Sequence, residues 1–257
     1  MLGDKRFIQS IKLQNFLSFG PDADEIELKS LNVLIGPNAS GKSNLIEAIG
    51  FLRASPIDLT SPIRDGGGVA EWLWKGSQKT PIAEANFLVS YPESIMPLRH
   101  RIAFTMVGQR FELVDEAVEN ERPEWSSLKD VRFYYRYENG HPVISVYTDQ
   151  VGETSSRRSS ERRLRREDLD LNQSVLSQRK DPDQYPEITY LGNQYSKIRL
   201  YREWNLGRYT LPRLPQKADL PDAPRHPGIR ASGSRLWVPD LPSRPGQVNV
   251  AVTGRVR

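Results

Sequence analysis

The first third of the chain changes from strand-like to helix-like hydrophobic patterns. Apolar and polar residues alternate through residues 6–19, which predicts a strand. A turn is predicted at residues 21–24 and a second short strand at residues 25–28. Residues 31–35 form a compact apolar run that ends at a glycine, which predicts a buried parallel strand. Residues 43–53 then carry apolar side chains at the spacing of one helix face.

The middle of the chain has the pattern of a sheet. Residues 55–80 are rich in Pro and Gly, which indicates loops. Strand patterns follow at residues 83–91, 101–107, 110–114, 131–137 and 143–147. The last two flank Asn139-Gly140, a strong hairpin signal. We therefore expect a mostly antiparallel sheet over residues 81–147, inserted after the helix.

The C-terminal part of the chain combines a charged arm with a segment that has no periodic pattern. Residues 152–204 form a charged, partly helical arm, in which residues 185–198 have helical spacing with Pro186 near the start. We interpret residues 197–204 as passing into a strand. Residues 223–257 contain six Arg, five Pro and four Gly but no periodic apolar pattern. A segment of this kind cannot bury enough surface to fold, so we expect a disordered tail after a single lobe of residues 1–222.

Composition and charge narrow the class of protein. With 37% hydrophobic residues the chain can build a core, and the absence of cysteine excludes disulfides and thiolate metal sites. The pI of about 9.2 comes from the tail, which has a net charge of +5. The other 222 residues hold 30 basic and 31 acidic groups, so the charge of this main part of the chain does not indicate DNA binding. No signal peptide and no run of roughly 18 apolar residues is present, which predicts a cytoplasmic protein without membrane contact.

A phosphate-binding motif lies between the apolar run and the helix. Its residues match the P-loop pattern in full and are Gly36, Pro37, Asn38, Ala39, Ser40, Gly41, Lys42 and Ser43. The glycines let successive backbone N–H groups point inward, and the following helix adds positive charge at its N-terminus. Lys42 would reach the β- and γ-phosphates, while the Ser43 hydroxyl would bind Mg²⁺. We predict ATP binding by residues 36–43 together with Asn44; the alternative is a glycine-rich turn without a ligand.

Hydrolysis would need a second carboxylate for magnesium and a group that positions water. Asp115 and Glu116, after Leu113-Val114, are the candidates. Glu112 interrupts the apolar run before them, and the segment belongs to an alternating strand. We interpret it as an exposed strand end, and no catalytic residue is identified.

The motif and its surroundings resemble a known group of ATPases. The sequence resembles the ATPase heads of the SMC, RecF and OLD group, which are ABC-like members of the broad AAA class. The resemblance lies in residues 36–49, in the preceding Leu31-Asn32-Val33-Leu34-Ile35 and in the opening Asn15-Phe16-Leu17-Ser18-Phe19. Residues 67–76 and Ser174-Val175-Leu176-Ser177 look like a subfamily of predicted bacterial ATPases within it. The resemblance spans roughly residues 6–222. It implies an α/β P-loop lobe with an inserted antiparallel β-subdomain.

The resemblance also implies a mechanism. Such heads bind ATP between two copies, with each P-loop facing a signature motif of the partner, so a homodimer of heads is expected. A later strand supplies the magnesium aspartate and the catalytic glutamate. Neither motif is found in this sequence, because the chain stops resembling the group at about Asp222.

Two observations coincide at that position. The resemblance ends, and lysine disappears: all ten lysines lie before residue 218. Our hypothesis is that residues 223–257 are read out of frame and that a C-terminal lobe is lost; the alternative is a natural disordered tail. Sequencing the locus tests this, since an alternative frame should encode an Asp-Glu strand and a signature motif.

An arginine-rich stretch at residues 157–166 could contact nucleic-acid phosphates. Acidic Glu161, Glu167 and Asp168 lie in and beside it, so we interpret it as a solvated loop or helix face.

Several aromatic residues could contact bases. Trp72 and Trp74 alternate around Leu73, and we interpret them as packing residues rather than a base-stacking platform. By the resemblance Phe16 and Phe19 could lie near adenine, although core positions are the preferred interpretation. We assign no chemistry to the three histidines, His100, His141 and His226.

Three functions remain open. The chain is an ATP-hydrolysing head of the SMC/RecF/OLD group, a module that binds ATP without hydrolysing it, or a P-loop kinase. The kinase is disfavoured because two strands precede the P-loop strand and a β insertion follows its helix. DNA or a partner nuclease is a possible partner, and the biological process cannot be inferred from the fold.

Overall fold

The computed structural model describes most of the N-terminal three quarters of the chain. The described residues are 6–123, 131–138, 141–148, 158–165, 167, 169–170, 172–201 and 249–251. They belong to two compact units, residues 1–197 and residues 198–257, and each unit is described by itself.

The first unit is built on an eight-stranded sheet in the order β2-β1-β3-β4-β5-β6-β7-β8. Its strands are β1 (Ile8–Gln14), β2 (Ile26–Glu27), β3 (Ala83–Val89), β4 (Leu98–Val107), β5 (Arg110–Asn120), β6 (Phe133–Glu138), β7 (His141–Thr148) and β8 (Arg158–Arg163). All neighbouring strands are antiparallel, which confirms the antiparallel prediction. The strict alternation of buried and half-buried residues along β3 shows why this pattern forms a strand with one covered face.

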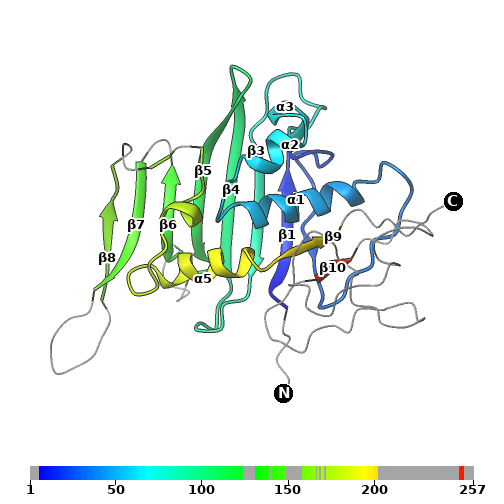
Figure 1. Cartoon of the computed structure of the whole chain (residues 1–257). Coiled ribbons are helices and arrows are strands. Elements are labelled where there is room, and N and C mark those ends of the chain that lie inside the picture. Colours follow the sequence, from blue (N-terminus) through cyan, green and yellow to red (C-terminus); the bar gives the residue numbers. More distant parts are fainter. Residues whose placement is uncertain are drawn as a thin grey trace, which may run out of the picture. The chain divides into compact units, whose positions relative to one another are not determined.

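Five helices are described in this unit. They are α1 (Lys42–Ala54), α2 (Ser61–Asp65), α3 (Val69–Trp72), α4 (Val175–Gln178) and α5 (Pro186–Tyr195). Phe51 of α1 packs on Phe104, and Tyr195 of α5 stacks on His100. Since His100 and Phe104 are four residues apart on β4, they point to the same face of the sheet. Helices α1 and α5 therefore cover one face, as Figure 1 shows.

An aromatic cluster joins the start of the chain to α1 and the sheet. Phe16, Phe51, Trp72 and Phe104 have ring centroids 5.4–5.8 Å apart, several of them edge to face. The Phe16 and Phe104 side chains are fully buried. Because Phe51 lies on the buried face of α1, the cluster holds α1 against the sheet.

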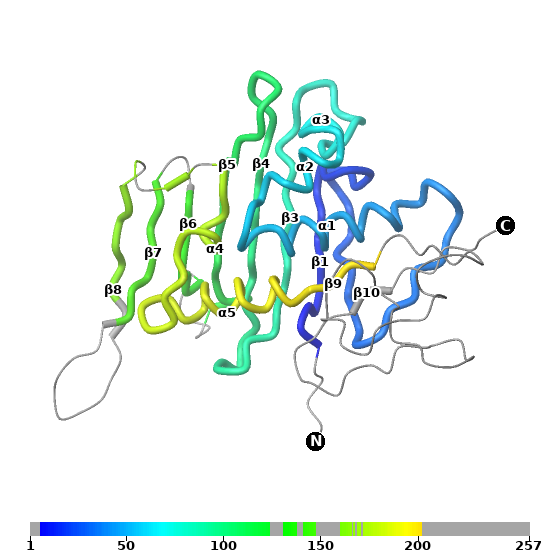
Figure 2. The backbone as a smooth tube through the Cα atoms, viewed as in Figure 1, coloured from blue at the N-terminus to red at the C-terminus, as the bar shows by residue number. Residues whose placement is uncertain are grey.

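The segment that leads into the P-loop differs from the prediction. Residues 31–35 form no strand, and Leu31, Val33 and Ile35 are 72%, 72% and 89% exposed. The prediction of a buried parallel strand is wrong for a physical reason. Because β1 is already paired with β2 and β3, residues 31–35 could join this end of the sheet only at the outer edge of β2, and no such pairing is present among the described residues. Figure 2 shows it as a loop running outside the sheet before α1 begins.

Other boundaries also differ. The predicted strands at residues 101–107 and 110–114 belong to longer strands, β4 and β5. Residues 55–80, predicted as loops, include the short helices α2 and α3. The arginine-rich stretch is an edge strand, β8, rather than a loop or helix face. Its Arg162 and Arg163 are exposed, and residues 157, 166 and 168 lie outside the described part.

The second unit contains two described strands. β9 (Arg199–Tyr201) pairs in parallel with β10 (Asn249–Ala251). The strand predicted around residues 197–204 is confirmed within its described part. Within the segment predicted to be a disordered tail, residues 249–251 form β10, and residues 223–248 and 252–257 lie outside the described residues.

Helices long and apolar enough to cross a membrane are absent from the described residues.

Candidate phosphate-binding site

The P-loop curls at two residues with left-handed backbone. Ala39 has φ 65° and Gly41 has φ 84°. Helix α1 begins directly after Gly41, at Lys42, one residue before the predicted start at Ser43. Left-handed residues between right-handed ones turn neighbouring N–H groups to one side of the chain, which is the geometry of an anion-binding nest.

Lys42 spans the loop that precedes it. Its Nζ donates to the carbonyl oxygens of Gly36 (2.9 Å) and Pro37 (2.6 Å) and to Ser40 Oγ (3.1 Å). These three contacts hold the ammonium group against the loop. A phosphate there would replace the weakest of these contacts and meet a cation that is already in position.

The N-terminus of α1 is open to an anion. Its first turn has no capping side chain and no acidic residue. The first N–H groups of a helix lack intrahelical acceptors, and the helix dipole favours negative charge there. Ser43 is the second residue of α1 and is exposed, Asn38 is exposed, and Asn44 is half-buried.

Side chains lie close to both motif glycines. A Cβ at Gly36 would lie 2.8 Å from Ser40 Oγ. A Cβ at Gly41 would lie 2.9 Å from Ser18 Oγ and 3.7 Å from Phe19 Cζ. The turn that holds Ser18 and Phe19 therefore lies against the P-loop.

That turn is tightly fixed. Phe16 N and Phe19 N each donate to the other residue's carbonyl oxygen, at 3.0 and 2.9 Å. Leu17 N donates to Trp72 O (2.7 Å), and Leu17 has φ 52°, which is rare for a bulky residue. Sequence reasoning did not place Ser18 beside the P-loop, because the contact depends on this turn rather than on any periodic pattern.

The comparisons with known proteins agree with this geometry. Residues 31–202 match the family described as "AAA domain, putative AbiEii toxin, Type IV TA system". The chain belongs to this family. The matched region covers more than half of the 257 residues and begins just before the P-loop. No curated protein and no solved structure matches the chain.

Membership in this AAA domain family makes nucleotide binding and ATPase chemistry the class of activity. The residues of the loop fit a magnesium ion that has a single protein ligand. Ser43 offers a hydroxyl oxygen at the helix start, and within the described ranges no cluster of three or more His, Cys, Asp or Glu could hold a metal. Mg²⁺ prefers few protein ligands and shares its coordination with phosphate oxygens and water. At this AAA domain Ser43 would be its protein ligand.

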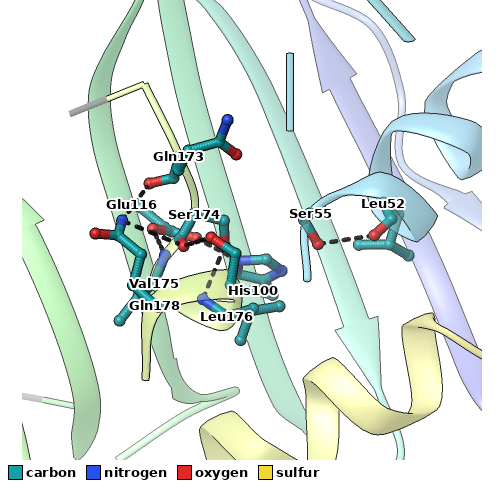
Figure 3. A network of polar contacts seen from close by, with 10 residues as sticks. Leu52, Ser55, His100, Glu116, Gln173, Ser174, Val175, Leu176 and Gln178 are labelled. Carbon is teal, nitrogen blue, oxygen red and sulfur yellow. Dashed lines mark hydrogen bonds and ion pairs between the residues drawn. The ribbon is translucent and has the colours of Figure 1, made fainter. Parts of the chain in front are cut away.

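Asp115 and Glu116 of the AAA domain both contact other side chains of the fold. Asp115 Oδ2 pairs with Arg101 (2.7 Å). Glu116 is fully buried; it accepts hydrogen bonds from Ser174 Oγ and from Val175 N (2.8 Å) and contacts His100 Nε2 (3.1 Å), as Figure 3 shows. The interpretation as an exposed strand end is therefore wrong for Glu116. Its environment comes from residues 174–175, which lie far away in sequence.

The aromatic residues behave largely as predicted. Phe16 and Trp72 are buried in the core of the AAA domain. Trp74 is half-buried against Gly76, where a Cβ would lie 2.2 Å from its ring. Phe19 is half-buried, and its ring lies beside Gly41 of the loop.

The histidines take different positions. His100 is buried between Glu116 and Tyr195, and His141 is exposed on β7. His226 lies outside the described residues.

Proposed function

We propose that this chain binds Mg²⁺-ATP at residues 36–44. The observation that carries the proposal is the fixed position of Lys42, whose ammonium bridges the first two carbonyls of the loop in front of an uncapped helix. Such a site recognises a polyphosphate by charge and by backbone N–H groups together. The family match supports a nucleotide as the ligand.

Each motif residue has a role in this proposal. Lys42 contacts the β- and γ-phosphates, and Ser43 binds the magnesium ion that bridges them. The backbone of residues 39–43 and the side chain of Asn38 line the phosphates. Asn44 lies one residue further along α1 and completes the site.

Hydrolysis is the proposed activity of the intact system. The resemblance to SMC, RecF and OLD heads implies ATP hydrolysis coupled to dimerisation of two heads. A second candidate is a module that binds ATP without hydrolysing it. This candidate is favoured by the engagement of Asp115 with Arg101 and of Glu116 with Ser174, because a carboxylate held this way is not available to magnesium or water. A P-loop kinase stays the least favoured candidate.

Nucleotide binding is tested by titrating the full chain with a fluorescent ATP analogue, with and without Mg²⁺. We expect saturable binding that is lost or weakened at least about 100-fold in Lys42→Ala, which removes the central cation. Lys79→Ala is the matched control, because Lys79 is exposed and lies outside the P-loop. Absence of binding by the wild type would contradict all three candidate functions.

Turnover and self-association separate the remaining candidates. Phosphate release above the level of Lys42→Ala would exclude the binding-only module. Sedimentation with and without ATP tests the head dimer, which should form only with nucleotide. The same assays repeated with duplex DNA test whether DNA is a partner.

A further inference from the structure

We propose that Gln173 and Ser174 form a bracket that fixes helix α1 on the sheet and thereby positions the P-loop for nucleotide. The two residues are adjacent in sequence but contact two different parts of the first unit. Gln173 binds the chain that leaves α1, and Ser174 binds a strand of the sheet. The inference rests on the proposed nucleotide-binding function.

The first arm of the bracket holds the end of α1. Gln173 Oε1 accepts from Leu59 N (2.8 Å), and Gln173 Nε2 donates to Asp58 Oδ1 (2.9 Å). One side chain therefore makes two hydrogen bonds to neighbouring residues. The Gln173 amide is also the main reason why the pKa of Asp58 lies well below its usual range, with further hydrogen bonds from Arg64 and Thr60.

The held segment follows α1 directly and is hydrogen-bonded to the last turn of the helix. Ser55 N bonds to Phe51 O (3.2 Å), and Asp58 N bonds to Ala54 O (2.9 Å). Lys180 Nζ adds a hydrogen bond to Pro56 O (2.9 Å) from the other side of α4. The end of α1 is thus tied at several points to residues 173–180.

The second arm holds the sheet. Ser174 Oγ donates to Glu116 Oε1, and Val175 N donates to Glu116 Oε2 (2.8 Å). Glu116 lies on β5 and is fully buried, as is Ser174. A buried carboxylate needs such donors, so this contact is costly to break. Figure 3 shows Ser174 beside Glu116, with Gln173 above them.

The bracket matters for the P-loop because the segment that leads into the loop is not paired with the sheet. The lead-in residues 31–35 form no strand, and Val33 and Ile35 are exposed. Among the described contacts, α1 is placed by the aromatic cluster around Phe51, by packing against α2 and α5, and by the bracket beyond its C-terminal end. Binding sites lose affinity when their elements are free to shift, since ordering them costs entropy.

The test compares Gln173→Ala with wild type in Mg²⁺-ATP affinity at a temperature where both are folded. We expect affinity to fall by about three- to tenfold, the effect of losing positioning hydrogen bonds. Gln9→Ala is the matched control: Gln9 Nε2, on β1, donates to Ser90 Oγ (3.0 Å), which follows the end of β3. Equal affinity in Gln173→Ala and wild type, or an equal loss in Gln9→Ala, would overturn the proposal.

Hydrogen exchange of the α1 amides gives a readout that does not need nucleotide. Exchange over residues 45–54 should be faster in Gln173→Ala than in Gln9→Ala at matched stability. Equal exchange would overturn the bracket. If wild type binds no nucleotide while Lys42→Ala behaves identically, the proposed function fails, and the exchange result alone decides whether the bracket positions α1.

Discussion

Gly41 and Gly108 share a backbone conformation but differ in their surroundings. Their φ angles are 84° and 56°, both in the left-handed region. A Cβ at Gly41 would meet Ser18 Oγ at 2.9 Å, whereas a Cβ at Gly108 would meet nothing within 4 Å. Alanine substitutions at the two glycines therefore distinguish the cost of the left-handed backbone from the cost of crowding beside the P-loop.

Gly41→Ala should therefore lower both stability and nucleotide affinity. The left-handed backbone costs roughly 1–2 kcal/mol for a residue with a Cβ. The contact with Ser18 adds to this and shifts the start of α1 away from the phosphate position. Urea unfolding and a nucleotide titration measure the two effects.

Gly108→Ala, in the turn between β4 and β5, is the matched control. It should lose a similar unfolding free energy, about 1 kcal/mol, and keep wild-type nucleotide affinity. A loss of affinity in this variant would mean that stability, not the geometry at Gly41, controls binding.

At the level of single elements, α5 begins at a buried carboxyl group. Glu187 is 6% exposed and accepts a hydrogen bond from Tyr147 Oη (3.0 Å). Burial raises the pKa of Glu187 above its usual 4.5, while its own backbone N–H, Tyr147 and Arg132 oppose this. Burial also raises the pKa of Tyr147, to about 12.

Glu187→Gln should stabilise the protein at pH 7. A carboxyl whose pKa is higher in the folded state holds its proton more tightly there, so the unfolding free energy falls as pH rises from 4.5 through the folded pKa. The amide keeps an acceptor for Tyr147 and removes the buried charge. Urea unfolding at pH 4 and pH 7 should show the gain at pH 7 alone. Glu27→Gln, at an exposed position of β2, should show no gain.

Helix α4 is fixed by its N-terminal serine. Ser174 Oγ accepts from Leu176 N (3.1 Å) and donates to Glu116. Ser174→Ala removes the cap and leaves a buried carboxylate short of a donor, so it should cost about 2–3 kcal/mol of unfolding free energy. Ser177→Ala loses one bond to Ser174 O (2.8 Å) at a half-buried position and should cost about 0.5–1 kcal/mol. Equal costs would contradict the role of Glu116.

Across the first unit, the sheet buries its apolar residues while the lead-in to the P-loop does not. Val33 is 72% exposed, and Val89 at the end of β3 is fully buried. Val33→Ser should change the unfolding free energy by less than about 0.5 kcal/mol, whereas Val89→Ser should cost about 2–4 kcal/mol. Urea unfolding of both variants measures the contrast. A large loss in Val33→Ser would show that residues 31–35 are buried in solution.

The P-loop and the helix after it could be predicted because both are local properties of the chain. Gly36, Gly41, Lys42 and Ser43 stand at fixed spacing, and the apolar positions of α1 follow the helical period. The strands β3 to β7 are predictable for the same reason, since alternation is a property of neighbouring residues. The Asn139-Gly140 turn lies outside the described residues, but β6 and β7 pair around it.

Burial and long-range contact could not be predicted in this way. Residues 31–35 have the composition of a central strand, yet their exposure depends on whether other strands lie beside them. The sequence neighbours of Glu116 indicate an exposed strand end, although Ser174 and Val175 decide its environment. The same holds for Ser18 at Gly41 and for Gln173 at Asp58, which are separated by long stretches of chain.

The amino-acid sequence determined the phosphate-binding loop, the helix behind it and the alternating strands, because motif spacing and hydrophobic period are set by residues close together in the chain. The tertiary structure decided which apolar run is covered, which carboxylate is buried and what holds α1 against the sheet. Those outcomes depend on which distant segments meet, since hydrogen-bond partners and burial are supplied by packing.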